Sequence, residues 1–375
     1  MDETFYDRRN LPLPDAEHRP ETDEDLVALV GGGAERERAF VFVGGGEHLA
    51  ASAIGERRFD VVRTDRLDRI RRVDRRSLTV RLEAGVRWGQ LRDELRDEGL
   101  SLQNYGLYPA GATVGGLLAR RQPVEAGFGD GDIRQGCIGL RSVAPGADGY
   151  DYLPAPRKAT GPDHRYLYIG GEGAVGAILE ATLVVGRRQP GMLLRLPAEG
   201  PAEAVTAYRR LRHLDLAPAW VRWGRESDRL EVALYAPAPL LEAHERRLRI
   251  ELDEAVEFVG GEAADQRRGE LESAAGGARS SEGAEGRLQV VWRLGDIDPA
   301  LEALPDGVEP VAIDRWSAQS ARVHLDLPDE ETAIDPEERA LDIRRVVDDE
   351  ERVWSAWLQR LKRRLDPDGR LAVGP

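Results

Sequence analysis

Three glycine-rich passages in the first half of the chain constrain its fold more than any other feature. They cover residues 43–49 (Val-Gly-Gly-Gly-Glu-His-Leu), 109–116 (Pro-Ala-Gly-Ala-Thr-Val-Gly-Gly) and 170–178 (Gly-Gly-Glu-Gly-Ala-Val-Gly-Ala-Ile). Each is expected where a hydrophobic strand gives way to a loop, and glycine presents backbone N–H groups that no Cβ atom obstructs. One such cluster alone would more simply mark an ordinary turn. Three in succession predict a large phosphorylated cofactor held from several sides.

The stretch between the first two passages adds a strand and a helix. Residues 78–86 are typical of a strand that ends in a glycine turn, and residues 88–98 of a helix. This order resembles the FAD-binding domain of the p-cresol methylhydroxylase (PCMH) and vanillyl-alcohol oxidase family. That family continues with Ala-Thr-Val-Gly-Gly, found here at 112–116, and with Gly-x-Glu-Gly-Thr-Leu-Gly. The latter corresponds to Gly-Glu-Gly-Ala-Val-Gly at 171–176, with Ala174 in place of threonine.

The resemblance covers about residues 20–190. Within the family the chain is most similar to the FAD-binding subunit of bacterial glycolate oxidase, by its compact length and by the Gly-Pro-Asp-His-Arg-Tyr-Leu segment at 161–167. The implied fold class is α+β, with a two-part PCMH-type FAD-binding domain and a ferredoxin-like α+β cap or substrate domain.

Length and composition limit the classes of function. A chain of 375 residues is expected to form two domains, and a formal net charge of −15 argues against nucleic acid as a partner. The single cysteine, Cys137, excludes an internal disulfide and an iron–sulfur cluster on this chain. The N-terminus lacks a secretory signal pattern, and no apolar run is long enough for a membrane span. We therefore expect a cytoplasmic protein.

The chain divides into four parts by pattern. Residues 1–20 are expected to form a flexible arm, 21–190 the FAD-binding domain, 191–345 the cap domain, and 346–375 a C-terminal helix and tail that return to the flavin domain. In the cap domain, strands and helices at 192–197, 201–213, 218–224, 229–235, 237–252 and 255–259 follow the β-α-β-β-α-β order of ferredoxin-like folds. Strands are expected again at 288–292 and 321–327.

The stretch 260–286 is rich in Gly, Ala, Glu, Ser and Arg, so it is predicted to be a long exposed loop, either a tolerated insertion or a docking surface.

Three further patterns fall in the first domain. Residues 21–30 predict a helix with Thr22 or Asp23 as its N-cap. Residues 39–43 predict a buried strand, and Asp148-Gly149 predicts an edge hairpin between strands 139–143 and 150–153.

The resemblance assigns cofactor-binding residues to the glycine passages. Gly44, Gly45 and Gly46 would wrap the pyrophosphate of FAD from one side. The second passage would face it from the other, through Thr113, Gly115 and Gly116, with Pro109, Gly111 and Val114 in the same loop. Glu172, Gly173, Gly176 and the backbone of Ile178 would approach the flavin or its ribityl chain.

A fourth segment, residues 127–136, corresponds loosely to a family segment that ends in Arg-Tyr-Gly. Here it ends in Arg134, Gln135 and Gly136. Arg134 would neutralise a phosphate, or it would pair with Asp130 or Asp132 in a structural role.

The first passage departs from the family at Glu47 and His48, where Thr-Ser is usual. A carboxylate near a pyrophosphate is unfavourable unless it turns away or is paired, and His48 is the available partner. Some family members attach FAD covalently to a histidine directly after the glycines. Because Glu47 takes that place here, we expect noncovalent FAD.

Catalytic residues are not identified by the sequence, and no metal site is expected. The histidine pair of related 2-hydroxy-acid dehydrogenases is missing, and His324 is expected in a core or edge position. The C-terminus keeps Asp-Pro-x-Gly but lacks the Asn-Pro-Gly of glycolate oxidase-like chains. No hydrolase motif is present. Arg222 and Arg315 are candidates to clamp a substrate carboxylate.

Two functions remain open at this point. One is an FAD-dependent oxidoreductase that removes a hydride from a hydroxyl-bearing carbon, as in a 2-hydroxy acid such as glycolate, onto flavin N5. It would work with a second flavin subunit and an iron–sulfur subunit. The alternative is a degenerate, noncatalytic relative that serves as an assembly or regulatory subunit.

Overall fold

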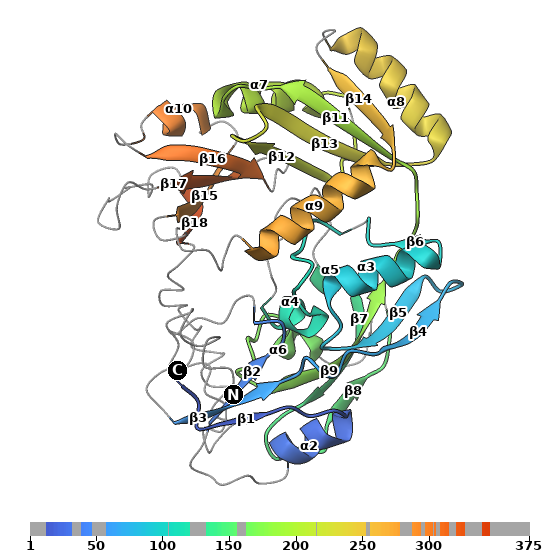
Figure 1. The fold of residues 1–375 in the computed structure, drawn as a ribbon, viewed down its shortest axis with the longest axis vertical. Helices are drawn as coiled ribbons and strands as arrows, with labels where there is room; N and C mark the ends of the chain where they lie inside the picture. The colour runs from blue at the N-terminus through green and yellow to red at the C-terminus, as the bar shows by residue number, and fades with distance from the viewer. Residues whose placement is uncertain are drawn as a thin grey trace.

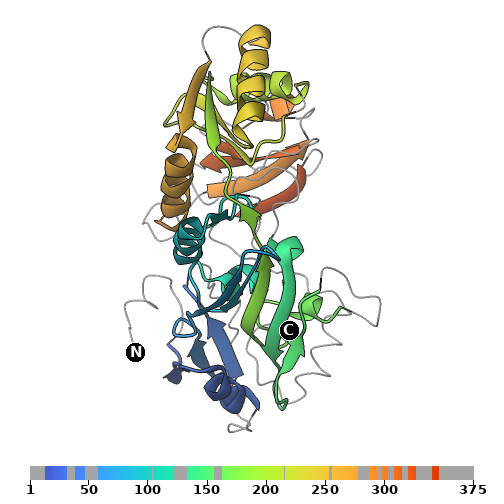
Figure 2. The same cartoon turned by 90° about the vertical axis from the view of Figure 1, so that its right-hand side faces the viewer.

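The chain folds into two domains stacked along its longest axis, the first with a parallel and an antiparallel sheet and the second with one antiparallel sheet (Figures 1 and 2). The computed structural model describes residues 13–31, 39–46, 58–103, 105–120, 133–155, 163–214, 216–252, 256–277, 287–293, 297–302, 304, 308–314, 320–326 and 340–345. No helix among them is both long and apolar enough to cross a bilayer.

A three-stranded parallel sheet begins the N-terminal domain. Its order is β1 (Ala16–His18), β3 (Phe59–Arg63) and β2 (Ala39–Val43). The run Ala-Phe-Val-Phe-Val makes β2 almost wholly buried, as parallel strands usually are. The predicted strand at 39–43 is confirmed. The predicted arm is wrong at its end, because residues 16–18 pair with β3 and belong to the sheet.

The N-terminal domain also contains a five-stranded antiparallel sheet. Its strands, in spatial order, are β4 (Ile70–Asp74), β5 (Thr79–Glu83), β9 (Ala177–Val184), β7 (Cys137–Val143) and β8 (Tyr150–Tyr152). The predicted hairpin is confirmed, because β7 and β8 pair antiparallel at the edge of this sheet. A separate short antiparallel pair is formed by β6 (Leu100–Ser101) and β10 (Gly186–Arg187).

Five helices are described in this domain: α2 (Asp23–Gly31), α3 (Trp88–Asp97), α4 (Val114–Arg120), α5 (Ile133–Gly136) and α6 (Arg165–Tyr168). At the start of α2 the Asp25 amide donates to the Thr22 hydroxyl, and the Thr22 amide donates to the Asp25 carboxylate, both at 3.1 Å. This reciprocal pair identifies Thr22, the first of the two predicted N-caps, as the capping residue.

The C-terminal domain is built on an eight-stranded antiparallel sheet. Its first half contains β11 (Gly191–Pro197), α7 (Pro201–Arg212), β12 (Trp220–Gly224), β13 (Arg229–Tyr235), α8 (Ala238–Glu251) and β14 (Glu257–Gly261). The spatial order β14-β11-β13-β12 is that of a ferredoxin-like unit, so the prediction for this half is confirmed.

The second half of this sheet repeats the arrangement. It comprises β15 (Arg287–Arg293), α10 (Ile297–Glu302), β16 (Glu309–Asp314), β17 (Ser320–Asp326) and β18 (Ala340–Arg345), in the spatial order β16-β17-β15-β18. The two halves join where β12 pairs with β16, the second strand of one half with the second strand of the other. The sequence predicted only β15 and β17 of this half.

The two faces of this sheet have different coverings. One face packs its apolar side chains, among them Leu194, Val232 and Trp223, against α7 and α8. The other face meets α9 (Ala263–Gly277) and the N-terminal domain (Figure 1). The loop predicted at 260–286 is therefore wrong over 263–277, where the chain is helical. Residues 278–286, the predicted final helix and the C-terminal tail lie outside the described residues.

Candidate cofactor site

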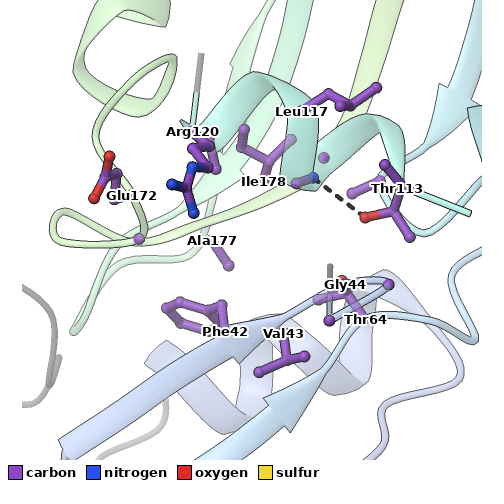
Figure 3. A pocket seen from close by; sticks show the side chains of 18 of the residues that line it. Phe42, Val43, Gly44, Thr64, Thr113, Leu117, Arg120, Glu172, Ala177 and Ile178 are labelled. Atoms are coloured by element: carbon purple, nitrogen blue, oxygen red, sulfur yellow. Dashed lines mark hydrogen bonds between the residues drawn. The ribbon is translucent and has the colours of Figure 1, made fainter. Parts of the chain in front are cut away.

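A cavity of about 150 Å³ opens between the two sheets of the N-terminal domain (Figure 3). All three glycine passages reach it, although they are far apart in sequence. Ten of the predicted site residues line this cavity: Gly44, Gly45, Gly46, Thr113, Gly115, Gly116, Glu172, Gly173, Gly176 and Ile178. The fold therefore brings most of the predicted residues to one place.

The first and second glycine loops touch each other at the edge of this cavity. A Cβ atom added to Gly44 would overlap the Thr113 hydroxyl, and one added to Gly45 would lie 2.6 Å from the Gly111 carbonyl oxygen. The contact leaves no room for a phosphate between Gly44 and Thr113. A ligand of both loops would lie along their shared rim.

The amides of the second loop have different partners. The Gly115 N–H donates to the Ala84 carbonyl at 2.7 Å, and the Val114 N–H donates to the Val86 carbonyl at 2.9 Å. The Gly116 N–H donates to the Thr113 hydroxyl at 3.3 Å, a long bond (Figure 3). Gly115 thus serves close packing, since a Cβ atom there would lie 2.6 Å from the Ala84 Cβ.

The third glycine loop folds over the far end of the cavity. Glu172 takes a positive φ of 53°, and its amide donates to the Ala119 carbonyl at the end of α4. A Cβ atom on Gly173 would lie 3.3 Å from the Phe42 ring across the cavity. The third glycine loop and the Phe42 ring are therefore close neighbours at this end, with no space for a planar group between Gly173 and the ring.

The cavity is apolar along its walls and charged at one end. The walls include Phe42, Leu117 and Ala177. Arg120 and Glu172 are the charged residues among the described lining, and they lie at the end opposite Thr113 and Gly44 (Figure 3). Apolar walls with a few polar groups are typical of cofactor sites.

Sequence reasoning missed Phe42, Thr64 and Arg120. Thr64 follows β3, whose neighbour β2 leads into the first glycine loop, and its amide donates to the Val43 carbonyl at 2.9 Å. Adjacent parallel strands end at the same edge, so this pairing was the available signal. Arg120 ends the short helix that starts from the second glycine loop.

Five predicted residues lie outside the cavity lining. Val114 is a core residue, and the Pro109 carbonyl accepts the Ala112 amide. The Gly111 carbonyl accepts a hydrogen bond from Arg87 at 2.7 Å. Arg134 stacks on the Tyr166 ring at 4.2 Å, and Gly136 packs tightly against Tyr105.

Several other predicted residues cannot be placed at the cavity. Glu47, His48, Asp130, Asp132 and Arg315 lie outside the described residues. The backbone of His324 pairs with Ala312 in the sheet. Arg222 lies on β12, is 23% exposed at its side chain and donates to the Glu226 carboxylate at 2.7 Å. No cluster of potential metal ligands occurs in the described part of the chain.

The cavity fits part of a dinucleotide cofactor. Its glycines let the surrounding loops approach one another closely, and its rim offers the Thr113 hydroxyl and glycine backbone beside apolar walls. Apolar walls with a polar rim at one end suit a segment of such a cofactor that carries both an apolar ring or chain and a polar group.

Comparison with known proteins gives the family of the first domain. Residues 14–150 match the family model described as FAD binding domain. L-galactono-1,4-lactone dehydrogenase of Brassica oleracea is 32% identical over 181 residues, covering 46% of this chain and 27% of that protein. D-lactate dehydrogenase [cytochrome] of Arabidopsis thaliana is 27% identical over 173 residues, covering 46% and 30%. The chain therefore spans less than a third of the length of these two relatives.

The fold of nearly the whole chain also has a counterpart. A solved structure of alkyldihydroxyacetonephosphate synthase superposes with a TM-score of 0.71 at 17% identity, covering 96% of this chain and 76% of that one. At this identity the likeness shows the fold alone. Residues 14–150 are therefore a PCMH-type FAD-binding domain, its cofactor is FAD, and the chain is homologous to FAD-dependent oxidoreductases.

Proposed function

We propose that this chain is an FAD-dependent oxidoreductase that oxidises a hydroxyl-bearing carbon of a 2-hydroxy acid. The observation that carries the proposal is the cavity in which the three glycine loops of the FAD-binding domain meet. The relative named D-lactate dehydrogenase supports the substrate class, because lactate is a 2-hydroxy acid.

The chain's own residues would bind and orient FAD. Gly46, Thr113 and Gly116 offer a polar rim suited to the pyrophosphate, and Phe42 and Ile178 offer apolar walls that exclude water. Bound FAD would supply the acceptor for the hydride that leaves the substrate carbon. Glu47 takes the position of the attachment histidine found in some family members, so we propose noncovalent FAD binding.

The substrate carboxylate would bind on the face of the C-terminal sheet that turns toward the first domain. Trp220 on this face packs with Leu107 of the N-terminal domain, and Arg222 follows it two positions later on the same strand. Alternate residues of a strand share a face, so Arg222 lies on this face as well. The guanidinium would exchange Glu226 for the substrate carboxylate, which suits its planar geometry.

A glycolate oxidase-like assembly is the finer form of this proposal. Electrons would leave FAD for an iron–sulfur partner on another chain, since this chain has one cysteine and that thiol is buried. A second flavin subunit would complete the complex.

The visible absorption spectrum of the purified protein, before and after acid precipitation, tests the proposal. We expect a flavin band that moves to the supernatant, and bleaching of that band when glycolate or D-lactate is added without oxygen. Arg222→Gln should raise KM for the acid and leave the flavin content unchanged. A flavin-bound protein that no 2-hydroxy acid bleaches would favour the noncatalytic, regulatory alternative. A colourless protein that FAD cannot reconstitute would contradict FAD binding itself.

A further inference from the structure

Helix α9 places two ionisable side chains at the contact between the domains. Arg268 is 4% exposed and Glu272 is fully buried, and they lie one helical turn apart. The Arg268 Nε donates to Glu272 Oε1 at 2.9 Å. Charged groups are rarely buried unless they are paired and hydrogen-bonded, so this pair calls for partners on both sides.

The partners of Arg268 are backbone carbonyls of the N-terminal domain. Its Nη2 donates to the carbonyl oxygens of Leu102, Tyr105 and Gly106, at 3.1, 3.2 and 3.1 Å. One guanidinium thus binds three carbonyls of a segment that has no regular secondary structure of its own. This segment leads directly into the second glycine loop.

Glu272 binds the same domain at a second place. Its carboxylate accepts from Arg92 Nη1 at 2.6 Å and from the Trp88 indole N–H at 3.3 Å, both on α3. Its backbone carbonyl accepts the Ala110 amide at 2.9 Å. Both ends of the 102–110 segment are therefore held by α9.

Trp88 connects this contact to the cofactor cavity. Its indole binds Glu272, while its backbone amide donates to the Ala112 carbonyl at 2.9 Å. Its buried ring also meets Tyr105 and Tyr108 edge to face. Ala112 lines the cavity, and the next residue, Thr113, packs on Gly44. No residue of α9 is found among the described lining residues.

We propose that Arg268 and Glu272 are positioning residues that set the 102–113 wall of the FAD cavity, so that docking of the C-terminal domain and FAD binding are coupled. The inference rests on the proposed function in needing FAD in that cavity. Coupling between sites is reciprocal, so FAD should in turn stabilise the docking of α9.

The test compares FAD affinity in matched variants of the full chain. Glu272→Gln removes the buried charge that holds Trp88 and Arg92. Glu270→Gln makes the same substitution on the same helix, at a half-exposed residue that pairs with Arg267. Titration by flavin fluorescence should give a Kd for FAD at least about fivefold higher for Glu272→Gln, within the usual range of coupling. The Kd of Glu270→Gln should stay within twofold of wild type.

Two further variants separate positioning from loss of stability. Arg92 is the partly exposed partner of Glu272, so its substitution is less disruptive to folding. Arg92→Gln should raise the Kd for FAD even if Glu272→Gln fails to fold. Leu248 lies in the core of the C-terminal domain, away from α9. Leu248→Ala should therefore lower the melting temperature without changing the Kd for FAD. FAD should also slow amide hydrogen exchange over 263–273 in wild type. The slowing should be smaller in Arg92→Gln.

Failures of the two proposals are distinguishable. Lack of FAD binding by the wild-type chain overturns the proposed function. Equal FAD affinity in wild type, Arg92→Gln and Glu272→Gln, or no effect of FAD on exchange in α9, overturns the coupling alone.

Discussion

At Gly44 the backbone of one glycine loop meets the side chain of another. Because a Cβ atom there would overlap the Thr113 hydroxyl, the two loops approach this closely only with glycine at this position. Thr113 also accepts the Gly116 amide, so pushing its hydroxyl aside would disturb the start of α4. One methyl group should therefore affect both folding and the shape of the cavity rim.

We expect Gly44→Ala to lower the free energy of unfolding by about 1–3 kcal/mol, the usual cost of overpacking. It should also weaken FAD binding. Urea unfolding and flavin titration measure the two effects. Gly200→Ala is the matched control, because a Cβ atom there has no neighbour within 4 Å. Equal stability of the two variants would mean that the glycine loops do not touch.

Ionisation of the Cys137 thiol makes the free energy of unfolding depend on pH. Burial raises the pKa of its thiol to about 12, whereas the thiol of an unfolded chain titrates near pH 8.5. Between these values the unfolded chain binds fewer protons, so this contribution to stability is complete below about pH 8.5 and falls as the pH rises.

We expect the free energy of unfolding of wild type to fall faster with pH than that of Cys137→Ala. The difference in slope should be about 1.4 kcal/mol per pH unit between pH 9 and 11. Urea titrations of both proteins at several pH values in that range measure it. Buried Tyr105 also has a raised pKa, but it is present in both proteins and its effect largely cancels in the comparison. Parallel pH profiles would show that the thiol is accessible to solvent.

At the scale of elements, the sequence predicted the strands and helices that bury apolar side chains. The strand at 39–43 and the first ferredoxin-like half have clear hydrophobic periods. Helix α9 could not be predicted in this way, because the residues it buries include Arg268 and Glu272, whose partners are far away in sequence. The position of Arg120 at the cavity could not be predicted for the same reason, because it depends on how α4 meets the third glycine loop.

Helix α2 is an element whose boundary the sequence did predict, and its cap can be tested. Thr22→Ala removes the hydroxyl that accepts the Asp25 amide, which should cost about 0.5–2 kcal/mol. Thr22→Asn retains a capping oxygen and should remain close to wild type. Urea unfolding of the two variants measures the difference. A full loss in Thr22→Asn would indicate that the threonine methyl group, rather than the cap, matters.

At the scale of the whole molecule, the domains share packing as well as polar contacts. Leu107 of the N-terminal domain is buried with Leu193, Trp220 and Ala264 of the C-terminal domain. This cluster lies beside the Arg268 and Glu272 contacts, since residues 102–110 carry both. The domains should therefore stabilise each other, and a substitution at this contact should affect both of them.

Leu107→Ala is expected to cost about 2–5 kcal/mol in free energy of unfolding, the range for truncating a buried leucine. Because its neighbours belong to the C-terminal domain, amide hydrogen exchange should quicken in α9 and β11, outside the substituted domain. Leu82→Ala provides the control, since Leu82 is buried in the N-terminal core, within the five-stranded sheet. It should cost a similar amount while exchange in α9 stays slow. If both variants accelerated exchange in α9 equally, the effect would come from lost stability of the first domain, and the shared packing at Leu107 would have no special part in joining the domains.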